Sequence, residues 1–268
     1  PISHSKSPLI HNYWIKKYSL NAIYRKKELN ESDLAETINK VREGSIKGLN
    51  VTVPFKKNLL DFVDIIDETA KKSKAINTIF KEKGKIIGAN TDGIGFVESL
   101  KKDLNVKLKQ GSEIFCIGSG GAAYGIISEL IKLKPNKIKI CNRTYSSAVK
   151  LRNHFSNQDK IMFELKPWGS QPDKNTNLLV NTSTYGMKKE DKQAFNLDLL
   201  TKKTFVYDII YDPKKTLLIE DALSRGLYNS NGTLMLIRQA AESFRRWFQI
   251  KLSNQDILEV KKLLKDYD

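Results

Sequence analysis

The sequence predicts an α/β protein built from two domains. About ninety residues at the start alternate helical and extended patterns, which is typical of an open, mostly parallel sheet with helices packed on it. From Gly93 the pattern changes, and a short apolar run over 114–117 leads directly into a glycine-rich loop and a helix. The chain has 268 residues, a size at which one hydrophobic core tends to split into two.

The elements of the first domain are marked by their ends. Ser32 precedes Asp33 and Glu36, acidic residues of the kind that favour the first turn of a helix. Pro54 ends a strand because proline cannot donate to the ladder, and Lys83-Gly84 marks the turn of a hairpin. The expected elements, in order, are a helix over 8–18, a strand over 22–26, a helix from Ser32, a strand over 49–53 and a hairpin of 77–80 with 85–88.

The second domain is predicted from a series of short apolar runs. A helix over 96–100 leads into the first run, and a helix over 122–133 follows it. Such runs are typical of strands that are buried on both faces of a parallel sheet. They cover residues 114–117, 138–141, 161–165, 178–181 and 205–209.

Two helices follow Gly232 and are expected to return to the first domain. The first of them has one apolar stripe, with residues spaced three, four, three and four apart. Gln239 lies off that stripe and can face something else. The stripe consists of Leu234, Ile237, Ala241, Phe244 and Phe248. We therefore place one domain at residues 1–92 plus 232–268 and the other at 93–231.

Composition places the chain among ordinary globular proteins. Its residues are 40% hydrophobic and 9% aromatic, and no stretch approaches the ~20 apolar residues of a membrane span. There is no signal-peptide pattern, although the sequence begins at Pro1 without a methionine. Cys116 and Cys141 lack metal-ligand spacing, which argues for free buried thiols in a reducing cytoplasm. The three histidines are scattered, so no metal site is expected.

The formal net charge of +16 makes nucleic acid a partner to consider. The lysines are spread along the whole chain in short pairs, such as Lys16-Lys17 and Lys71-Lys72, with no long basic arm. The aromatic-rich signature of RNA-binding modules is also missing. We therefore expect no nucleic-acid partner, since attraction of anionic small molecules is a sufficient use of the charge.

The loop after the strand at 114–117 has the spacing G-x-G-x-x-A of a dinucleotide-binding turn. Gly118 would make the tight turn, Gly120 would let the backbone approach a pyrophosphate, and Ala123 would let the helix pack on the strand. The helix N-terminus would offer free N–H groups to the diphosphate. A strand precedes this loop, a helix follows it, and a second strand comes at the expected distance. This context distinguishes the loop from an ordinary glycine-rich connection.

The end of the second strand indicates which dinucleotide is bound. A cofactor with a free ribose 2′-hydroxyl usually meets an acidic residue there. This chain has Asn142-Arg143-Thr144 instead. A guanidinium with amide and hydroxyl donors suits a 2′-phosphate, because an arginine–phosphate contact is charge-assisted and often bidentate. The sequence therefore predicts NADP(H).

Four short segments of the first domain carry polar residues that a plain α/β core does not need. Each alone has an ordinary explanation: serines before Pro8 begin a helix, Lys56 is solvated, and the asparagine-rich segments are turns. Yet Asn50 and Thr52 share one face of a strand that ends just before Lys56, and clustered hydroxyls at a helix start favour a carboxylate. The segments are 3–8, 50–56, 77–78 and 90–93.

Taken together, these segments resemble the shikimate dehydrogenase family in their order and in their residues, and the resemblance extends over nearly the entire chain. So many ordered motifs make chance agreement negligible. The matching stretches are PISHSKSP at 1–8, NVTVPFK at 50–56, AINT at 75–78, NTDG at 90–93, the glycine loop, NRT at 142–144, NTSTYGM at 181–187, YDIIYDPKKT at 207–216 and NGTLMLIRQA at 231–240.

The resemblance implies an NADPH-dependent, reversible reduction of 3-dehydroshikimate to shikimate in aromatic amino acid biosynthesis. It implies a substrate domain at 1–92 plus 232–268, a Rossmann-like NADP-binding domain at 93–231, a cytoplasmic location, and a monomer or homodimer. The nearest alternative is a quinate/shikimate dehydrogenase that uses NAD or NADP. A nucleotide-sensing regulator without the chemistry is another class, and the presence of both Lys56 and Asp92 speaks against it.

The resemblance also implies roles for individual residues. Ser5, Ser7 and Tyr211 would hold the substrate carboxylate, and Lys56 with Asp92 would form the catalytic pair. A lysine ammonium can stabilise charge on the ketone oxygen and supply a proton. Thr52, Asn77, Asp92 and Gln239 would hydrogen-bond the ring hydroxyls, with Lys56 also touching the substrate. The cofactor would contact Glu68, Gly118, Ser119, Gly120, Gly121, Ala122, Asn142, Arg143, Thr144, Ser147, Met187, Ile209 and Gly232.

Two positions depart from the family pattern. Ser147 stands where a cation often follows the NRT motif, and Tyr124 stands where an arginine often follows the glycine loop. Arg143 would then face the 2′-phosphate with fewer cationic helpers, Lys150 being one substitute. The family also has a strand before the position of Pro1, so we expect the first sheet to lack that element.

Overall fold

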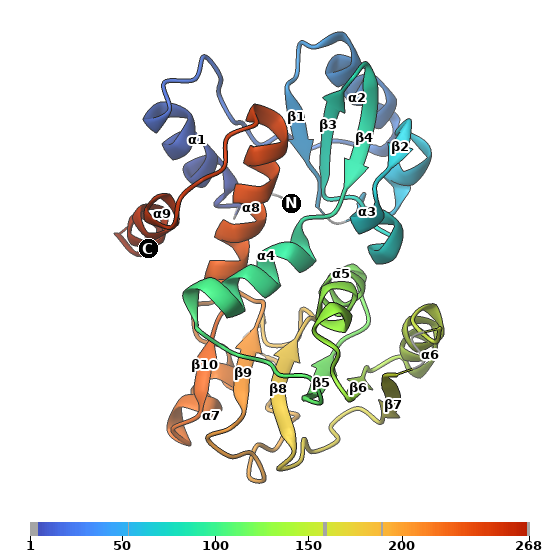
Figure 1. The fold of residues 1–268 in the computed structure, drawn as a ribbon, viewed down its shortest axis with the longest axis vertical. Coiled ribbons are helices and arrows are strands. Elements are labelled where there is room, and N and C mark those ends of the chain that lie inside the picture. Colours follow the sequence, from blue (N-terminus) through green and yellow to red (C-terminus); the bar gives the residue numbers. More distant parts are fainter. Residues whose placement is uncertain (1–4, 53, 158–159, 189, 267–268) are drawn as a thin grey trace. The chain divides into compact units, whose positions relative to one another are not determined.

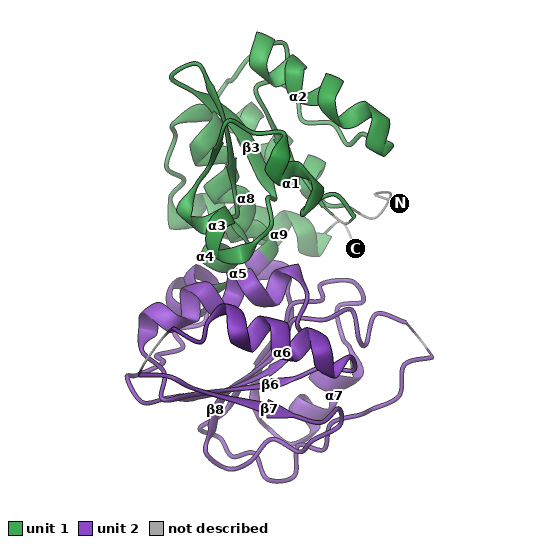
Figure 2. Cartoon of the chain, turned by 90° about the vertical axis from the view of Figure 1, so that its right-hand side faces the viewer, with its two compact units in different colours: residues 1–96, 236–268 green, residues 97–235 purple. Residues whose placement is uncertain are grey.

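In the computed structural model, residues 5–52, 54–157, 160–188 and 190–266 are described. The chain forms two compact units, unit 1 with residues 1–96 and 236–268 and unit 2 with residues 97–235 (Figure 2). It passes into unit 2 within helix α4 (Asp92–Glu98) and returns within helix α8 (Thr233–Phe248). Each unit has its own sheet (Figure 1), as expected for a two-domain α/β protein.

Unit 1 contains a mixed sheet with the order β1-β3-β4-β2. β3 (Thr78–Glu82) and β4 (Lys85–Ala89) form the predicted hairpin, and φ is positive at both turn residues, Lys83 (48°) and Gly84 (76°). β1 (Gly48–Asn50) pairs antiparallel with β3, whereas β2 (Ile65–Ile66) pairs parallel with β4. The expectation of a mostly parallel sheet is wrong for this unit, because a two-residue turn reverses the chain and imposes antiparallel pairing.

The segment 22–26, expected as a strand, has no regular secondary structure. Its backbone is held by a side chain: the Asn12 amide donates to the Tyr24 carbonyl (2.9 Å) and accepts from the Tyr24 N–H (2.8 Å). A side-chain amide can satisfy the same backbone groups that strand pairing would use. The local sequence pattern does not distinguish these two outcomes.

Helices cover both faces of the unit 1 sheet. α2 (Leu34–Glu43) and α3 (Glu68–Ser73) pack on the face that carries Ile79 and Ile86. On the opposite face, Trp247 of α8 packs against Phe80 and Ile87. This alternation along the hairpin is the period of two expected for a strand. Short 3-10 helices, η1 (Glu31–Asp33) and η2 (Asn58–Asp61), precede α2 and β2.

A second cluster in unit 1 joins the two ends of the sequence. It packs α1 (Ser7–Lys17) against α8 and α9 (Asn254–Asp266). The apolar stripe predicted for α8 is confirmed, since Ile237 and Phe244 are fully buried in this cluster. The return of the C-terminal helices fixes α8 beside the strands that carry the polar segments.

Unit 2 contains a parallel sheet with the order β10-β9-β8-β5-β6-β7, which confirms the Rossmann-like arrangement. The strand order reverses between β5 (Glu113–Ile117) and β8 (Thr176–Asn181), so the loops after these strands lie at a switch point, where open parallel sheets bind ligands. The other strands are β6 (Lys137–Cys141), β7 (Met162–Lys166), β9 (Phe205–Asp208) and β10 (Tyr228–Ser230).

The five strands predicted for this unit are confirmed to within two residues. α4 continues into a π-helix, η3 (Ser99–Asp103), where a helix over 96–100 was expected. Helix α5 with η4 fills the predicted range 122–133, whereas β10, α6 and α7 have no counterpart in the prediction. Their bounds are α5 (Gly121–Leu130), η4 (Ile131–Leu133), α6 (Tyr145–His154) and α7 (Leu217–Ser224).

Candidate active site

Lys56 and Asp92 form an ion pair in unit 1, with Lys56 Nζ 2.6 Å from Asp92 Oδ2. Asp92 is the first residue of α4, and its backbone N–H donates to Asn90 Oδ1 (3.0 Å). Lys56 follows β1, and its carbonyl accepts from the Ile76 N–H (2.7 Å). The side chains are 21% and 10% exposed, so solvent screens the pair only in part. The two residues expected to act together are in direct contact.

Asn77 holds the other oxygen of Asp92. Asn77 Oδ1 accepts the Thr91 backbone N–H (2.8 Å), a group that can only donate, so the amide nitrogen must point the other way. That nitrogen donates to Asp92 Oδ1 (2.8 Å) and to Thr91 Oγ1 (2.9 Å). Each carboxylate oxygen of Asp92 therefore has its own donor, Asn77 on one side and Lys56 on the other.

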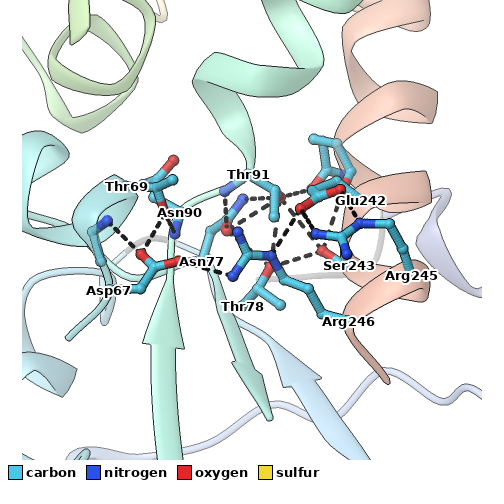
Figure 3. Close-up of polar contacts among 12 residues, drawn as sticks. Asp67, Thr69, Asn77, Thr78, Asn90, Thr91, Glu242, Ser243, Arg245 and Arg246 are labelled. Carbon is cyan, nitrogen blue, oxygen red and sulfur yellow. Dashed lines mark hydrogen bonds and ion pairs between the residues drawn. The ribbon is translucent and has the colours of Figure 1, made fainter. Parts of the chain in front are cut away.

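Behind Asn77 lies a cluster of three fully buried hydroxyl groups, those of Thr78, Thr91 and Ser243. Thr78 Oγ1 donates to Asn77 Oδ1 (2.9 Å) and lies 2.7 Å from Ser243 Oγ. Figure 3 shows these groups running from the strand ends to Ser243 on α8. Because buried polar groups are costly when unpaired, this network fixes Asn77 in one orientation.

A chain of ion pairs supports the same region from α8. Arg246 reaches Asp67 Oδ2 (2.8 Å) and Glu242 Oε1 (3.0 Å), as Figure 3 shows. Asp67 caps α3, and Thr69 Oγ1 accepts the backbone N–H of Asn90 (2.8 Å). The segment that leads into Asp92 is therefore tied to two helices.

Gln239 lies on α8 one turn before Ser243, and Thr91 Oγ1 lies 3.4 Å from its Oε1. α4 passes α8 at Gly95, where an added Cβ would lie 2.6 Å from the Gln239 backbone nitrogen. A glycine is needed here because any side chain would push the two helices apart. The off-stripe position of Gln239 thus faces the polar segment before α4.

The residues predicted to bind a carboxylate lie in both units. Ser5 and Ser7 lie at the start of α1, and the Ser7 N–H donates to Ser5 Oγ (3.3 Å). Thr52, expected to bind a hydroxyl, follows β1 and is exposed. Tyr211 belongs to unit 2, after β9, and burial raises the pKa of its hydroxyl. Residues 3–4, the start of the serine-rich segment, lie outside the described part of the chain.

The glycine loop after β5 makes a tight turn and leads into the start of α5. Gly118 has φ +104°, and a Cβ there would lie 2.7 Å from Thr182 Oγ1. Gly120 has open space where its Cβ would be, and no side chain caps the α5 N-terminus within the described residues. The first N–H groups of α5 are therefore available to an anion. The loop and first turn are completed by Ser119, Gly121 and Ala122.

The segment after β6 presents Arg143 and Thr144 to solvent. Asn142 Nδ2 donates to the Thr144 carbonyl (2.8 Å), which shapes the turn before α6. Arg143 Cζ lies 5.8 Å from the centre of the Trp168 ring. Ser147 is half-buried in the first turn of α6. The one cation predicted for a 2′-phosphate is exposed and lies against an aromatic ring.

The other predicted cofactor contacts are spread over both units. Met187, after β8, is 50% exposed, and Ile209, after β9, is half-buried. A Cβ at Gly232 would lie 1.8 Å from the Ile209 carbonyl oxygen, so only glycine fits there. Glu68 lies on α3 of unit 1, and its exposed carboxylate pairs with Lys71 (3.2 Å).

Asp208, at the end of β9, is a buried carboxylate that the sequence did not single out. It accepts from Thr216 Oγ1 (2.6 Å), Asn181 Nδ2 (3.0 Å) and the Ile210 N–H (3.1 Å), and all three donors are neutral. Burial raises the pKa of this carboxyl to about 6. The three bonds join the ends of β8 and β9 to the start of α7.

Sequence reasoning also missed Ser243 and Trp168. Ser243 lies four residues after Gln239, and residues at that spacing share a helix face. That signal could have marked Ser243 as part of the same polar cluster. Trp168 had no comparable signal, because its contact with Arg143 depends on the register between two strands.

Several properties of the described residues bear on the kind of site. No group of three or more His, Cys, Asp or Glu among them could hold a metal ion. None of the helices within the described ranges is long and apolar enough to cross a membrane. Cys116 and Cys141 are both free and buried.

Comparison with known proteins identifies the family of this chain. Residues 1–79 match a family model described as the shikimate dehydrogenase substrate binding domain. The shikimate dehydrogenase (NADP(+)) of Pelagibacter ubique is 41% identical over 251 residues, which cover 93% of this chain and 91% of the relative.

Solved structures of shikimate dehydrogenases are also similar to this chain. The crystal structure of shikimate dehydrogenase from Aquifex aeolicus has a TM-score of 0.85 at 35% identity, covering 97% of this chain and 93% of that chain. A shikimate dehydrogenase crystallised in complex with NADP+ has a TM-score of 0.86 at 31% identity, covering 96% and 90%. The chain thus belongs to the shikimate dehydrogenase family.

Proposed function

We propose that this chain catalyses the NADPH-dependent, reversible reduction of 3-dehydroshikimate to shikimate, a step of aromatic amino acid biosynthesis. The observation that carries the proposal is the Lys56–Asp92 pair, with Nζ and Oδ2 2.6 Å apart and Asn77 on the second carboxylate oxygen. Family membership supports the substrate and the cofactor, because relatives over nearly the whole chain are named shikimate dehydrogenase (NADP(+)). In this assignment unit 1 supplies most of the substrate contacts and unit 2 most of the NADP(H) contacts.

Lys56 is the proposed proton donor. When bound, NADPH supplies the hydride that reduces the ketone carbon. The Lys56 ammonium stabilises the negative charge that develops on the ketone oxygen and gives that oxygen a proton. Asp92 holds Lys56 in place and can relay the proton in the reverse direction. Asn77 keeps the Asp92 carboxylate from rotating, since it occupies the oxygen that Lys56 does not.

The remaining substrate contacts come from hydroxyl and amide groups. Ser5, Ser7 and Tyr211 bind the carboxylate, and Thr52 and Gln239 bind ring hydroxyls together with Asn77 and Asp92. The start of α1 supports the carboxylate assignment, since a helix N-terminus favours negative charge.

The cofactor assignment rests on how the residues of unit 2 fit a dinucleotide phosphate. The loop of Gly118, Ser119, Gly120, Gly121 and Ala122 leaves the N-terminus of α5 open to a diphosphate. The segment of Asn142, Arg143, Thr144 and Ser147, in which Arg143 and Thr144 are exposed, suits the 2′-phosphate. Met187, Ile209 and Gly232 are assigned to the nicotinamide half, and Glu68 to a further cofactor contact.

An initial-rate assay with two acids and two coenzymes tests the proposal. Shikimate with NADP+ is expected to give the highest kcat/KM among the four combinations of shikimate or quinate with NADP+ or NAD+. A fivefold or greater preference for quinate with NAD+ would replace the proposal by its nearest alternative, a quinate/shikimate dehydrogenase. We also propose a cytoplasmic location, which two free, buried cysteines support.

A further inference from the structure

Arg143 and Trp168 are brought together by the register of two parallel strands. β6 and β7 pair Cys141 with Lys166 at their ends. Arg143 lies two residues beyond Cys141, and Trp168 lies two residues beyond Lys166, so both leave the sheet at the same edge. The distance of 5.8 Å from Arg143 Cζ to the ring centre is within the ~6 Å range of a cation–π contact.

The Trp168 ring is itself held firmly. It meets Tyr185 edge-on at 5.2 Å and 87°, and Phe195 at 5.0 Å and 76°. Phe195 is 1% exposed and belongs to the core of unit 2. The Cys141 Sγ donates to the carbonyl of Pro167, the residue before Trp168 (3.0 Å). The ring is therefore a fixed platform, since aromatic pairs in this geometry stabilise one orientation.

Arg143, by contrast, has an exposed side chain. No ion pair joins it to a carboxylate in the part of the chain that the structure describes. The pKa of the Asp191 carboxyl is lowered mainly by two backbone hydrogen bonds and also by the charge of Arg143. Asp191 accepts these bonds from the backbone N–H groups of Gly186 (2.8 Å) and Lys188 (3.2 Å). With its guanidinium over the Trp168 ring, Arg143 can still offer N–H groups for bidentate contact with an anion.

The two positions where the family often has a cation carry none here. Ser147 is uncharged, and Tyr124, 8% exposed, packs against His154 and Phe155. Discrimination of a 2′-phosphate from a 2′-hydroxyl thus depends on how well Arg143 is held before binding. An arginine that is already ordered loses less rotamer entropy on binding its ligand.

We propose that Trp168 determines cofactor specificity by holding Arg143 in position for the 2′-phosphate. This inference rests on the proposed use of NADP(H). Trp168 is a positioning residue here, because it acts through Arg143. Its effect should appear with ligands that carry a 2′-phosphate and not with ligands that lack one.

Calorimetric binding of adenosine 2′,5′-bisphosphate and of 5′-AMP tests the inference without turnover. Trp168→Leu is expected to weaken binding of the bisphosphate about two- to fivefold, the effect of one exposed cation–π contact, and to leave 5′-AMP unchanged. In the enzyme assay the KM for NADP+ should rise by the same factor, with kcat and the kinetics with NAD+ unaltered. Trp168→Phe keeps an aromatic face and should retain most of the wild-type affinity.

Two further outcomes decide against the inference. Equal weakening of both probes would overturn it, because the ring would then serve the fold or the adenine. Unchanged binding of both would also overturn it. In an Arg143→Leu background, Trp168→Leu should have no further effect on the bisphosphate. A wild-type protein that binds both probes equally would overturn the NADP(H) preference itself, whereas the other outcomes leave that preference intact.

Discussion

Unit 1 and unit 2 hold the side chains proposed for function in opposite ways. In unit 1, Lys56, Asp92 and Asn77 are held by hydrogen bonds to one another and to buried hydroxyl groups. In unit 2, the glycine loop offers backbone N–H groups, and Arg143 is an exposed cation beside a ring. A substitution in unit 1 therefore changes the chemistry or orientation of a fixed group, whereas one in unit 2 changes space and charge around a ligand.

The largest effect is expected from Lys56→Ala. Removing a general acid typically costs on the order of 10²–10⁴ in rate, so kcat should fall by that factor. NADPH affinity, measured by fluorescence titration, should stay near the wild-type value, because the residues of unit 2 proposed to bind the cofactor are unchanged. Lys57→Ala is the matched control, since Lys57 is the exposed neighbour. Turnover that survives Lys56→Ala would remove this lysine from the mechanism.

Two alanine substitutions in the glycine loop of unit 2 should have different effects. One should lower the stability of the fold, and the other should weaken NADPH binding. Gly118→Ala places a side chain at φ +104° and 2.7 Å from Thr182 Oγ1, so the backbone alone costs roughly 1–2 kcal/mol and the unfolding temperature should drop. Gly120→Ala meets nothing within 4 Å, so the unfolding temperature should hold. Its methyl group would lie where the proposed pyrophosphate contact is made, so NADPH binding should weaken on the order of tenfold.

Thermal unfolding and NADPH titration of the two variants check this difference. An equal loss of stability in Gly118→Ala and Gly120→Ala would contradict it, because the second position would then have a structural role. Wild-type NADPH affinity in Gly120→Ala would show that this backbone does not approach the diphosphate.

The same contrast explains what the sequence could predict. The unit 2 loop follows from local rules, because a strand, a glycine spacing and a helix are adjacent in the chain, and they are found to within two residues. The strand register that places Trp168 beside Arg143 is not local, and no periodicity reveals it. In unit 1 the segment 22–26 has a strand pattern, yet the side-chain amide of the distant Asn12 forms hydrogen bonds with the backbone N–H and carbonyl of Tyr24.

The unit 1 site shows the same limit. Resemblance brought Lys56 and Asp92 together as a pair, and the structure places them in contact. The buried hydroxyls behind Asn77 come from a strand, a strand end and α8, and only tertiary packing assembles them. The mixed sheet was also mispredicted, although the hairpin turn that makes it antiparallel was recognised.

Ser243→Ala tests whether the buried network of unit 1 affects catalysis. The substitution removes the partner of Thr78 Oγ1 at 2.7 Å and loosens Asn77, so kcat should fall roughly three- to tenfold, with NADPH affinity unchanged. Stability should fall by about 1–3 kcal/mol, since buried polar groups lose a partner. Steady-state kinetics and chemical denaturation measure the two effects.

Ser73 is the matched control for this prediction. It is also fully buried, and its hydroxyl donates to the carbonyls of Ala70 (3.3 Å) and Ala75 (2.9 Å). Ser73→Ala should lose stability without a comparable loss of kcat. Ser243→Thr keeps a hydroxyl and should recover part of the rate. If both alanine variants lower kcat equally, the effect on Asn77 is not specific to the network.

The smallest effect concerns Asp208 at the end of β9, compared with Asp92 at the start of α4. Asp92 has Lys56 as a cationic partner, whereas Asp208 accepts from neutral donors and its pKa is raised by burial from 3.8 to about 6. The folded state thus favours protonated Asp208. Its stabilising contribution is fully present below about pH 4 and is lost as pH rises through 6. The free energy of unfolding should fall from this cause by at most about 1.4 kcal/mol per pH unit.

Asp208→Asn removes this dependence. The unfolding free energy of the variant should therefore increase relative to that of the wild type as pH rises from 4 to 7. Urea denaturation across that range measures the difference. Asp61→Asn, at an exposed site, should run parallel to the wild type. Parallel curves for Asp208→Asn as well would mean that Asp208 titrates alike in folded and unfolded chains. The neutral hydrogen bonds from Thr216 and Asn181 would then offset the full cost of burying its charge, without the cationic partner that Asp92 has in unit 1.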